Sequence, residues 1–302
     1  MKKAVSIITS CYGWEKYLNA FFDSYKNQTI FKDCELVFVH NDPSWLELDI
    51  VNNFKTKYAN QINHIIVDRE PISVSMNRAI LASSSDVLIN RDIDDFRTEN
   101  SLELQYNTLN DNNNIFCSYG DFIIINTFGD RIGKYIKPIE FDKYKFVESM
   151  HCWPFRARKK EIHEKVWYFD EQLKSGADYD LMLRIAYAYE IKKTHWLLWY
   201  YLNANTGLST GSDKFVSLQE LELKVINTRY HIYHKIDYLI DYNYDIYDSK
   251  RIKNDWKLIP MNKIIASFMF NRNMNSVLQS IYFTIKQLFL RTAKYFYIKY
   301  MK

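Results

Sequence analysis

Glycine is scarce in this sequence, with 7 in 302 residues, and proline and cysteine are also few, at 5 and 4. Neither GxGxxG nor GxxxxGKS/T occurs, which excludes the two common glycine-rich phosphate loops. The four cysteines are scattered and form no CxxC pair, so neither a disulfide framework nor a zinc knuckle is predicted. We therefore expect a protein of the reducing cytoplasm.

Long apolar runs are missing as well. No stretch that is both apolar and uncharged reaches the ~18–20 residues that a membrane-spanning helix needs. The N-terminal apolar run is short and breaks into GWEKY without a small-residue cleavage site, which favours a strand over a signal peptide.

Acidic residues are absent after Asp255, where eight lysines and arginines follow. Since the whole chain carries +4, residues 1–255 carry −4 and the tail carries +8. Body and tail are thus expected to be physically different parts of the protein.

The first 90 residues alternate between β-branched apolar runs and amphipathic segments. We predict buried strands at residues 4–9, 34–39, 63–67 and 86–90. We predict helices between them at residues 15–28, 44–58 and 73–82, the second with Ser44 as N-cap. This alternation predicts a parallel α/β sheet that binds ligands at the carboxyl ends of its strands.

The run LINRDIDDF, residues 88–96, leads one predicted strand directly into three carboxylates, Asp92, Asp94 and Asp95. Such a cluster is either an ordinary acidic turn or a cation site, because like charges repel unless solvent or a cation compensates them. Its place at a strand end favours the cation site. Carboxylate oxygens suit Mg²⁺ or Mn²⁺, and such an ion could hold the diphosphate that the missing glycine loop cannot.

Four segments, in order, resemble a family-2 glycosyltransferase with the GT-A fold over roughly the first 210 residues. They cover residues 5–29, 35–44, 73–95 and 174–186. The sequence departs from the usual motifs at Ser10–Gly13, at His40–Pro43 and at Ala177, which replaces a glutamate. The resemblance implies a Rossmann-like catalytic domain at 1–213, with a nucleotide-binding half at 1–100 and an acceptor half at 101–213. A helical, basic extension is expected at 214–302.

The resemblance also implies roles for the acidic residues. Asp94 is expected to ligate Mn²⁺ or Mg²⁺, Asp92 to lie near the ribose or the metal, and Asp95 to support the loop. Asp178 is the expected general base. Asp180 is the alternative base or a helix cap, and Arg184 is expected to pair with one of these aspartates.

The expected donor contacts are Ser10, Tyr12, Asn41, Asp42, Asn77 and Asp92. Tyr12 could stack on a nucleobase, although core packing is the alternative for a tyrosine in a chain with 24 of them. The acceptor candidates are His151, Trp153 and Arg156. A zinc site at His231 and His234 is not expected, since no third ligand stands at useful spacing.

The resulting hypothesis is an inverting, metal-dependent transfer of a sugar from a nucleotide sugar, with UDP the default nucleotide, to a glycan or lipid-linked glycan. The alternatives are a nucleotidyltransferase and a non-catalytic binding protein. The tail is predicted either to lie on the anionic inner face of the membrane, or to pack on the catalytic domain or on a second copy of the chain. A nucleic-acid partner is not expected.

Overall fold

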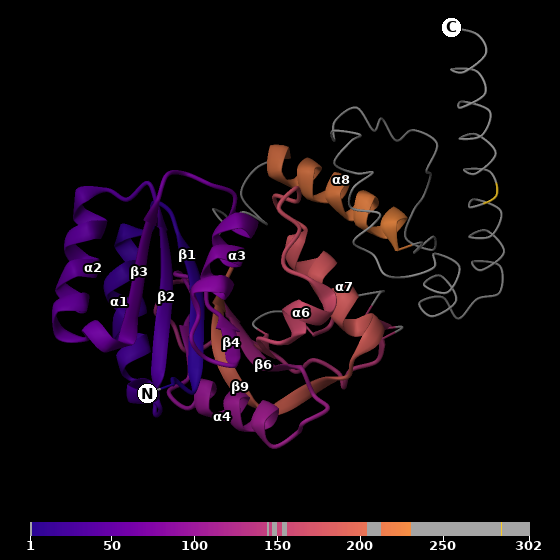
Figure 1. Cartoon of the computed structure of the whole chain (residues 1–302), viewed down its shortest axis with the longest axis horizontal. Coiled ribbons are helices and arrows are strands. Elements are labelled where there is room, and N and C mark those ends of the chain that lie inside the picture. Colours follow the sequence, from indigo (N-terminus) through magenta and orange to yellow (C-terminus); the bar gives the residue numbers. More distant parts are fainter. Residues whose placement is uncertain are drawn as a thin grey trace, which may run out of the picture.

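Four parallel strands form the N-terminal half of the sheet in the computed structural model (Figure 1). The structure describes residues 2–143, 145–146, 150–152, 156–203, 213–230 and 285. The four strands, in the spatial order β3-β2-β1-β4, are β1 (Val5–Cys11), β2 (Cys34–Asn41), β3 (Ile62–Val67) and β4 (Val87–Asn90). All four predicted strands are present, and their carboxyl ends point to one edge of the sheet.

The helices of this half begin and end close to their predicted limits. They are α1 (Glu15–Lys26), α2 (Trp45–Lys57) and α3 (Ile72–Ala82). Ser44 caps α2 as predicted, and it forms a capping box with Glu47: the Ser44 hydroxyl accepts from the Glu47 amide while the Glu47 carboxylate accepts from the Ser44 amide.

The second half makes the sheet mixed. β4 pairs antiparallel with β8 (Ala157–Lys159), and the order continues β8-β6-β9-β5. These strands are β6 (Cys117–Ile125), β9 (Ile191–Leu202) and β5 (Phe96–Arg97), with β7 (Lys134–Ile136) beside β6. The predicted parallel arrangement thus holds for the first four strands, and the complete described sheet is a mixed α/β sheet.

Helices cover both faces of this sheet. The remaining ones are α4 (Ser101–Asn110), α6 (Ile162–Val166), α7 (Ala177–Ala188) and α8 (Asp213–Arg229), with short 3₁₀ turns η1 (Phe31–Asp33) and η2 (Ala59–Gln61). Buried side chains of α1, α2 and α4 form one core with Ile7 of β1, and those of α3, α6 and α7 form another with Ile8. Adjacent residues of β1 thus enter opposite cores, because side chains alternate along a strand.

The first part of the predicted extension packs against α7. Helix α8 lies beside α7 (Figure 1), and Ile226 of α8 belongs to the same core as α7. The boundary at 213/214 stays a prediction. Among the helices that the structure describes, none combines the length and apolarity that crossing a bilayer requires.

Leu36→Ala tests the buried sheet, since Leu36 of β2 is fully buried. Removal of its side chain leaves a cavity, and we expect a loss of about 2–5 kcal/mol in the free energy of unfolding. Leu81→Ala is the matched control, because Leu81 of α3 is 65% exposed, and it should change stability by no more than about 0.5 kcal/mol. Urea denaturation measures both, and equal losses would contradict the assignment of Leu36 to the core.

Candidate active site

The acidic loop after β4 is held by a buried arginine at each end. The Arg91 amide donates to the Ile8 carbonyl at 3.1 Å, and its guanidinium donates to the Phe21 carbonyl at 3.1 Å. The Arg97 guanidinium donates to Gln105 and to the Asn90 carbonyl, both at 2.9 Å. Burial lowers the pKa of each arginine to about 9. This rigid frame fixes the carboxylates between them.

The three aspartates of the loop have different surroundings. Asp95 is buried and accepts a hydrogen bond from the Leu202 amide at 3.0 Å, so it supports the loop from within. Asp94 is half-buried, and Asp92 is the most open to solvent. Burial, followed by the charges of Asp92 and Asp94, raises the pKa of Asp95 well above its usual value.

Asp92 combines solvent access with crowded surroundings. Desolvation by the protein atoms around it, followed by repulsion from Asp94 and Asp178, raises its pKa to about 7, although Arg97 and Arg156 act in the opposite direction. Burial also raises the pKa of Asp94, against the opposing effects of its own backbone and Lys16. Asp92 therefore lies within electrostatic reach of both Asp94 and Asp178, although 86 residues separate it from Asp178 in the sequence.

Asp178 is the second residue of α7, and its side chain is 43% exposed. Its Oδ1 accepts from the Tyr179 amide at 2.7 Å, and its Oδ2 accepts from the Arg156 guanidinium at 3.2 Å. Arg156 also donates to the Asp178 carbonyl at 3.2 Å. The structure thus brings together a predicted base and a predicted acceptor residue, and it leaves the carboxylate accessible.

Asp180 has a different environment from Asp178. Its side chain is 1% exposed, and it pairs with Arg184 and with Arg229, each at 2.7 Å, and accepts from the Tyr230 hydroxyl at 3.0 Å. The predicted ion pair of Arg184 is confirmed. Enclosed by these partners, Asp180 serves the packing of α7.

On the donor side, Tyr12 and Asp42 are exposed beyond the ends of β1 and β2. The Tyr12 ring is 45% exposed and has the Arg69 guanidinium 3.4 Å from its centroid, so it is not a core residue. Asp42 adopts a left-handed backbone conformation with φ 42°, which aspartate tolerates better than most residues. Ser10 is half-buried and accepts from the Asn41 amide group at 3.2 Å.

Two predicted donor contacts lie inside the protein. Asn41 is buried, and its side chain bonds to Ser10, to Ser75 and to the Glu70 amide. Asn77 is also buried; it accepts from the Phe169 amide and donates to the Phe169 carbonyl, each at 2.9 Å. Asn77 thus ties α3 to the segment that precedes Asp178. A donor contact for either residue stays a prediction.

The model of the family described as glycosyl transferase family 2 matches residues 6–167, which is more than half of the chain. The chain belongs to this family. The match includes the acidic loop and Arg156, and it ends before Asp178. The predicted resemblance is therefore confirmed.

Relatives of this family-2 glycosyltransferase include the O-antigen biosynthesis glycosyltransferase WbnJ of Escherichia coli. It is 25% identical over 191 residues, which are 60% of this chain and 71% of WbnJ. The crystal structure of S. aureus TarS 1–349 superposes with a TM-score of 0.56 at 18% identity, and its complex with UDP-GlcNAc with 0.58 at 17%. Each match covers 75% of this chain, and the chain spans about two thirds of those structures, 65% and 66%. They confirm the predicted GT-A fold.

The acceptor candidates are only partly described in this family-2 protein. The His151 ring is half-buried and accepts from the Asp142 amide at 3.4 Å, and it packs near Phe141 and Phe146. Trp153 lies outside the described residues, as do His231 and His234.

Sequence reasoning did not identify a buried cluster that lies next to the loop that carries Tyr12. Cys11, His40 and Glu47 offer ligand atoms within 4.8 Å of one another, the one such group among the described residues. Glu47 already accepts from the Trp14 amide at 3.0 Å and from the Ser44 amide at 2.9 Å. Burial, then the charge of Glu47, raises the pKa of the Cys11 thiol, which disfavours metal binding. We assign this cluster to fixing the loop of Tyr12. A Ser-x-x-Glu capping box at 44–47 was its visible sequence signal.

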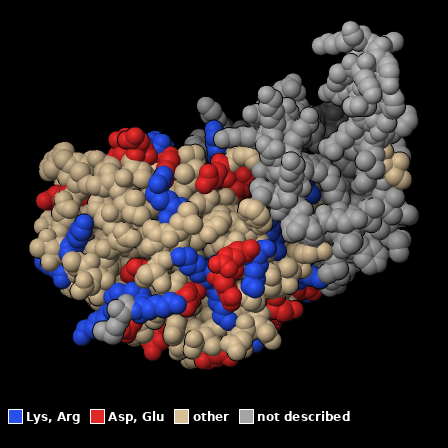
Figure 2. Space-filling view, in the orientation of Figure 1, with Lys and Arg blue, Asp and Glu red and all other residues tan. Residues whose placement is uncertain are grey.

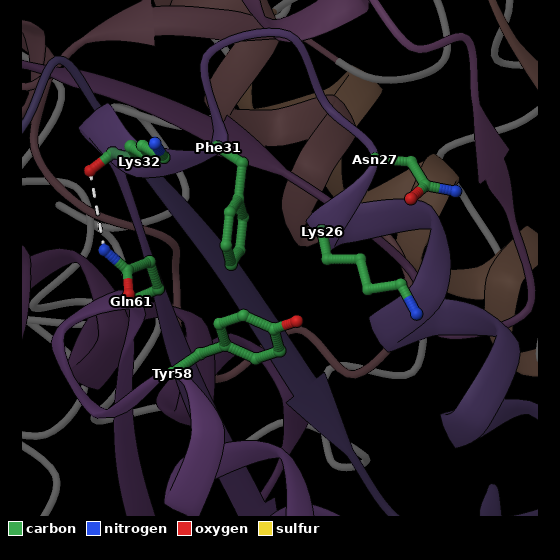
Figure 3. A pocket seen from close by; sticks show the side chains of 6 residues that line it. All are labelled: Lys26, Asn27, Phe31, Lys32, Tyr58 and Gln61. Carbon is green, nitrogen blue, oxygen red and sulfur yellow. Dashed lines mark hydrogen bonds between the residues drawn. The ribbon is translucent and has the colours of Figure 1, made fainter.

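A separate pocket of ≈ 560 Å³ is lined by six residues, none of which is a predicted site residue. Figure 3 shows the Phe31 and Tyr58 rings between Lys26 and Lys32, with the Gln61 side chain donating to the Lys32 carbonyl at 3.5 Å. These residues come from the ends of α1 and α2 and from η1 and η2.

Surface charge is mixed on the face that Figure 2 shows. Acidic and basic side chains alternate over its described part without a continuous basic stripe, which a nucleic-acid interface would need.

Asp180→Asn should destabilise the protein. The change removes the charge that compensates two guanidinium groups whose side chains are only 10% and 11% exposed, and we expect a loss of about 3–5 kcal/mol in the free energy of unfolding. The control is Asp178→Asn, which removes a partly exposed pair with Arg156 and should cost no more than about 1 kcal/mol. Chemical denaturation at pH 7 measures both, and similar losses would contradict the distinction.

The pH dependence gives a second test of Asp180. Burial raises its pKa, but Arg184 and Arg229 outweigh burial and hold it below the usual value. The stabilisation that Asp180 provides is therefore present above the unfolded-state pKa, and it is lost as pH falls through the lower folded-state pKa. The stability gap between wild type and Asp180→Asn should shrink in that acidic range.

Proposed function

We propose that this chain is an inverting, metal-dependent glycosyltransferase that moves a sugar from a nucleotide diphosphate sugar to a hydroxyl of a glycan acceptor. The observation that carries the proposal is that Asp178, which pairs with Arg156, lies within electrostatic reach of Asp92 in the acidic loop after β4, where Asp94 stands two residues further on. A sugar transfer needs charge compensation at the leaving diphosphate and a base at the acceptor hydroxyl. The two groups of residues suit these two tasks.

The carboxylates of the acidic loop suit a hard divalent cation. Asp94 and Asp92 supply carboxylate oxygens, the ligands that Mg²⁺ and Mn²⁺ prefer. Desolvation raises the pKa of both carboxyl groups, and at Asp92 repulsion from Asp94 and Asp178 adds to it; a bound cation would favour the charged form of each. When bound, such a cation neutralises charge on the diphosphate. Asp95, already bonded to the backbone of β9, would hold this loop in shape.

Asp178 would accept the proton of the acceptor hydroxyl. Its accessible side chain permits contact with a bound acceptor, and the bonds from Tyr179 and Arg156 fix its orientation. A single base-assisted hydroxyl that displaces the diphosphate directly inverts the anomeric centre. Arg156, placed beside the base, is then part of the acceptor site, with His151 and Trp153 as further candidates.

The donor is proposed to be UDP-hexose or UDP-N-acetylhexosamine. The TarS complex with UDP-GlcNAc supports this choice through a shared fold. Tyr12 offers an exposed aromatic face to the uracil ring, and Arg69 lies beside it. Asp42 is exposed near the same edge of the sheet. Ser10, Asn41 and Asn77 would act by shaping this edge through their hydrogen bonds.

A glycan or lipid-linked glycan is the proposed acceptor, which the relation to an O-antigen glycosyltransferase supports. The acid-free tail after residue 255 is proposed to bring the site to an anionic membrane surface, with a second copy of the chain as the alternative partner. Except for Ile285, this tail lies outside the described residues.

Asp94→Ala should abolish the enhancement of UDP binding by Mn²⁺. The alanine removes the proposed ligand, so calorimetric titration of UDP should give the same affinity with and without the metal. Asp86→Ala is the control, because Asp86 is an exposed carboxylate just before β4, and it should bind like wild type. Metal-enhanced affinity that survives in Asp94→Ala would refute the assignment. The alternative function, a non-catalytic binding protein, predicts that the wild-type chain binds the nucleotide sugar but neither transfers nor hydrolyses it.

Asp178→Asn should separate binding from chemistry. Asparagine keeps the shape of the side chain but cannot take the proton, so the transfer rate should fall about 10²–10⁴-fold while UDP affinity is kept. The measurement is UDP release from the matching nucleotide sugar, identified by thermal stabilisation in the presence of Mn²⁺. Asp86→Asn should react like wild type. Transfer by Asp178→Asn at the wild-type rate would place the base elsewhere.

A further inference from the structure

Three consecutive backbone amides just before α7 point to one buried carboxylate. The Glu222 Oε1 accepts from the Lys174 amide at 2.8 Å, and its Oε2 accepts from the Ser175 and Gly176 amides, each at 2.7 Å. Glu222 is fully buried and belongs to α8, 46 residues beyond Gly176. Hydrogen bonds to a charged acceptor are about twice as strong as neutral ones.

The start of α7 lacks a local cap. Its N-cap residue is Gly176, which has no side chain to bond to the orphan amides, and no side-chain cap is present. The Glu222 carboxylate takes amides of the N-cap and of the two residues before it, and its negative charge suits the positive end of the α7 dipole. A residue far along the sequence thus fixes the backbone where α7 begins.

α8 approaches the backbone closely at Gly176. A Cβ at position 176 would lie 2.7 Å from the Ile226 Cδ1 and 3.5 Å from the Glu222 Cβ. Ile226 is fully buried. The two elements are therefore in direct contact, and Glu222 cannot shift without moving the loop.

Arg229, at the C-terminal end of α8, adds further bonds between α8 and the segment 170–180. Its guanidinium bonds to Asp180 at 2.7 Å and to Asp170 at 2.9 Å, residues on either side of the loop. The Tyr230 hydroxyl also donates to Asp180. α8 thus holds the segment 170–180 at both ends, and Asp178 stands within it.

We propose that Glu222 is a positioning residue for Asp178, and this inference rests on the proposed function. Glu222 contacts no reacting group; it sets the backbone from which the Asp178 carboxylate projects toward Arg156 and Asp92. A catalytic group displaced by about 1 Å can lose roughly 10²-fold in rate. The transfer step should thus depend on a carboxylate at position 222.

The test compares Glu222→Gln with Glu220→Gln. Both changes remove one negative charge from α8, but Glu220 is exposed, so it controls for the charge of the helix. Glutamine at 222 keeps the volume and replaces one acceptor oxygen by an amide that faces N–H donors. We expect kcat to fall about 10–100-fold with the donor KM within about threefold of wild type, while Glu220→Gln behaves like wild type.

A double-mutant cycle shows whether the effect passes through Asp178. In the Asp178→Asn background, Glu222→Gln should cause no further loss of transfer, because the group that it positions is already inactive. Equal losses in both backgrounds, or an unchanged kcat in Glu222→Gln, would overturn the proposal.

Hydrogen exchange makes the test independent of catalysis and of the folding of the variant. In the wild-type protein the amides of residues 174–176 should be protected, and Glu222→Gln should speed their exchange at least about tenfold, if the three hydrogen bonds form. Unprotected amides in the wild type would overturn the inference directly. If the amides are protected and Asp178→Asn transfers normally, the proposed base is wrong and the positioning role for it falls, whereas the anchor itself stands.

Discussion

Arg91 and Arg97 frame the acidic loop in the sequence, and both side chains are buried where the loop leaves and rejoins the sheet. Between them stand three aspartates, whose mutual repulsion would otherwise open such a loop. Hydrogen bonds from the arginines to the backbone of Phe21 and Asn90 join the loop to α1 and β4. The guanidinium charges also offset part of the repulsion at Asp92 and Asp95. The geometry of the site depends on this frame.

The N-terminal half of the fold could be predicted because its signals are local. The buried strands are apolar runs, and α2 begins at a capping box that four adjacent residues define. The mixed half could not be predicted in this way. Its strands β5 and β8 have 2 and 3 residues, too few for any periodicity, and their pairing depends on partners far along the chain.

The candidate site likewise has a part that the sequence could predict and a part that it could not. The order of the motifs indicated Asp92, Asp94 and Asp178, and in the structure Asp92 lies within electrostatic reach of the other two. Burial is not visible in a motif, so the sequence could not show that the Asn41 and Asn77 side chains bond within the protein; their contacts with the donor stay predictions. The pair of Arg156 with Asp178 and the anchor at Glu222 join distant segments, and no spacing rule connects them.

The segment that bears Asp178 is held from two directions. On one side Asn77 of α3 bonds to the backbone of Phe169. On the other side α8 bonds to residues 170, 174–176 and 180. Phe169, Leu173 and Ala177 place buried side chains in the core beside α7, and these polar anchors fix the backbone between them. α3 and α8 are thereby both joined to the segment that bears Asp178, and these contacts extend along the chain to residue 230.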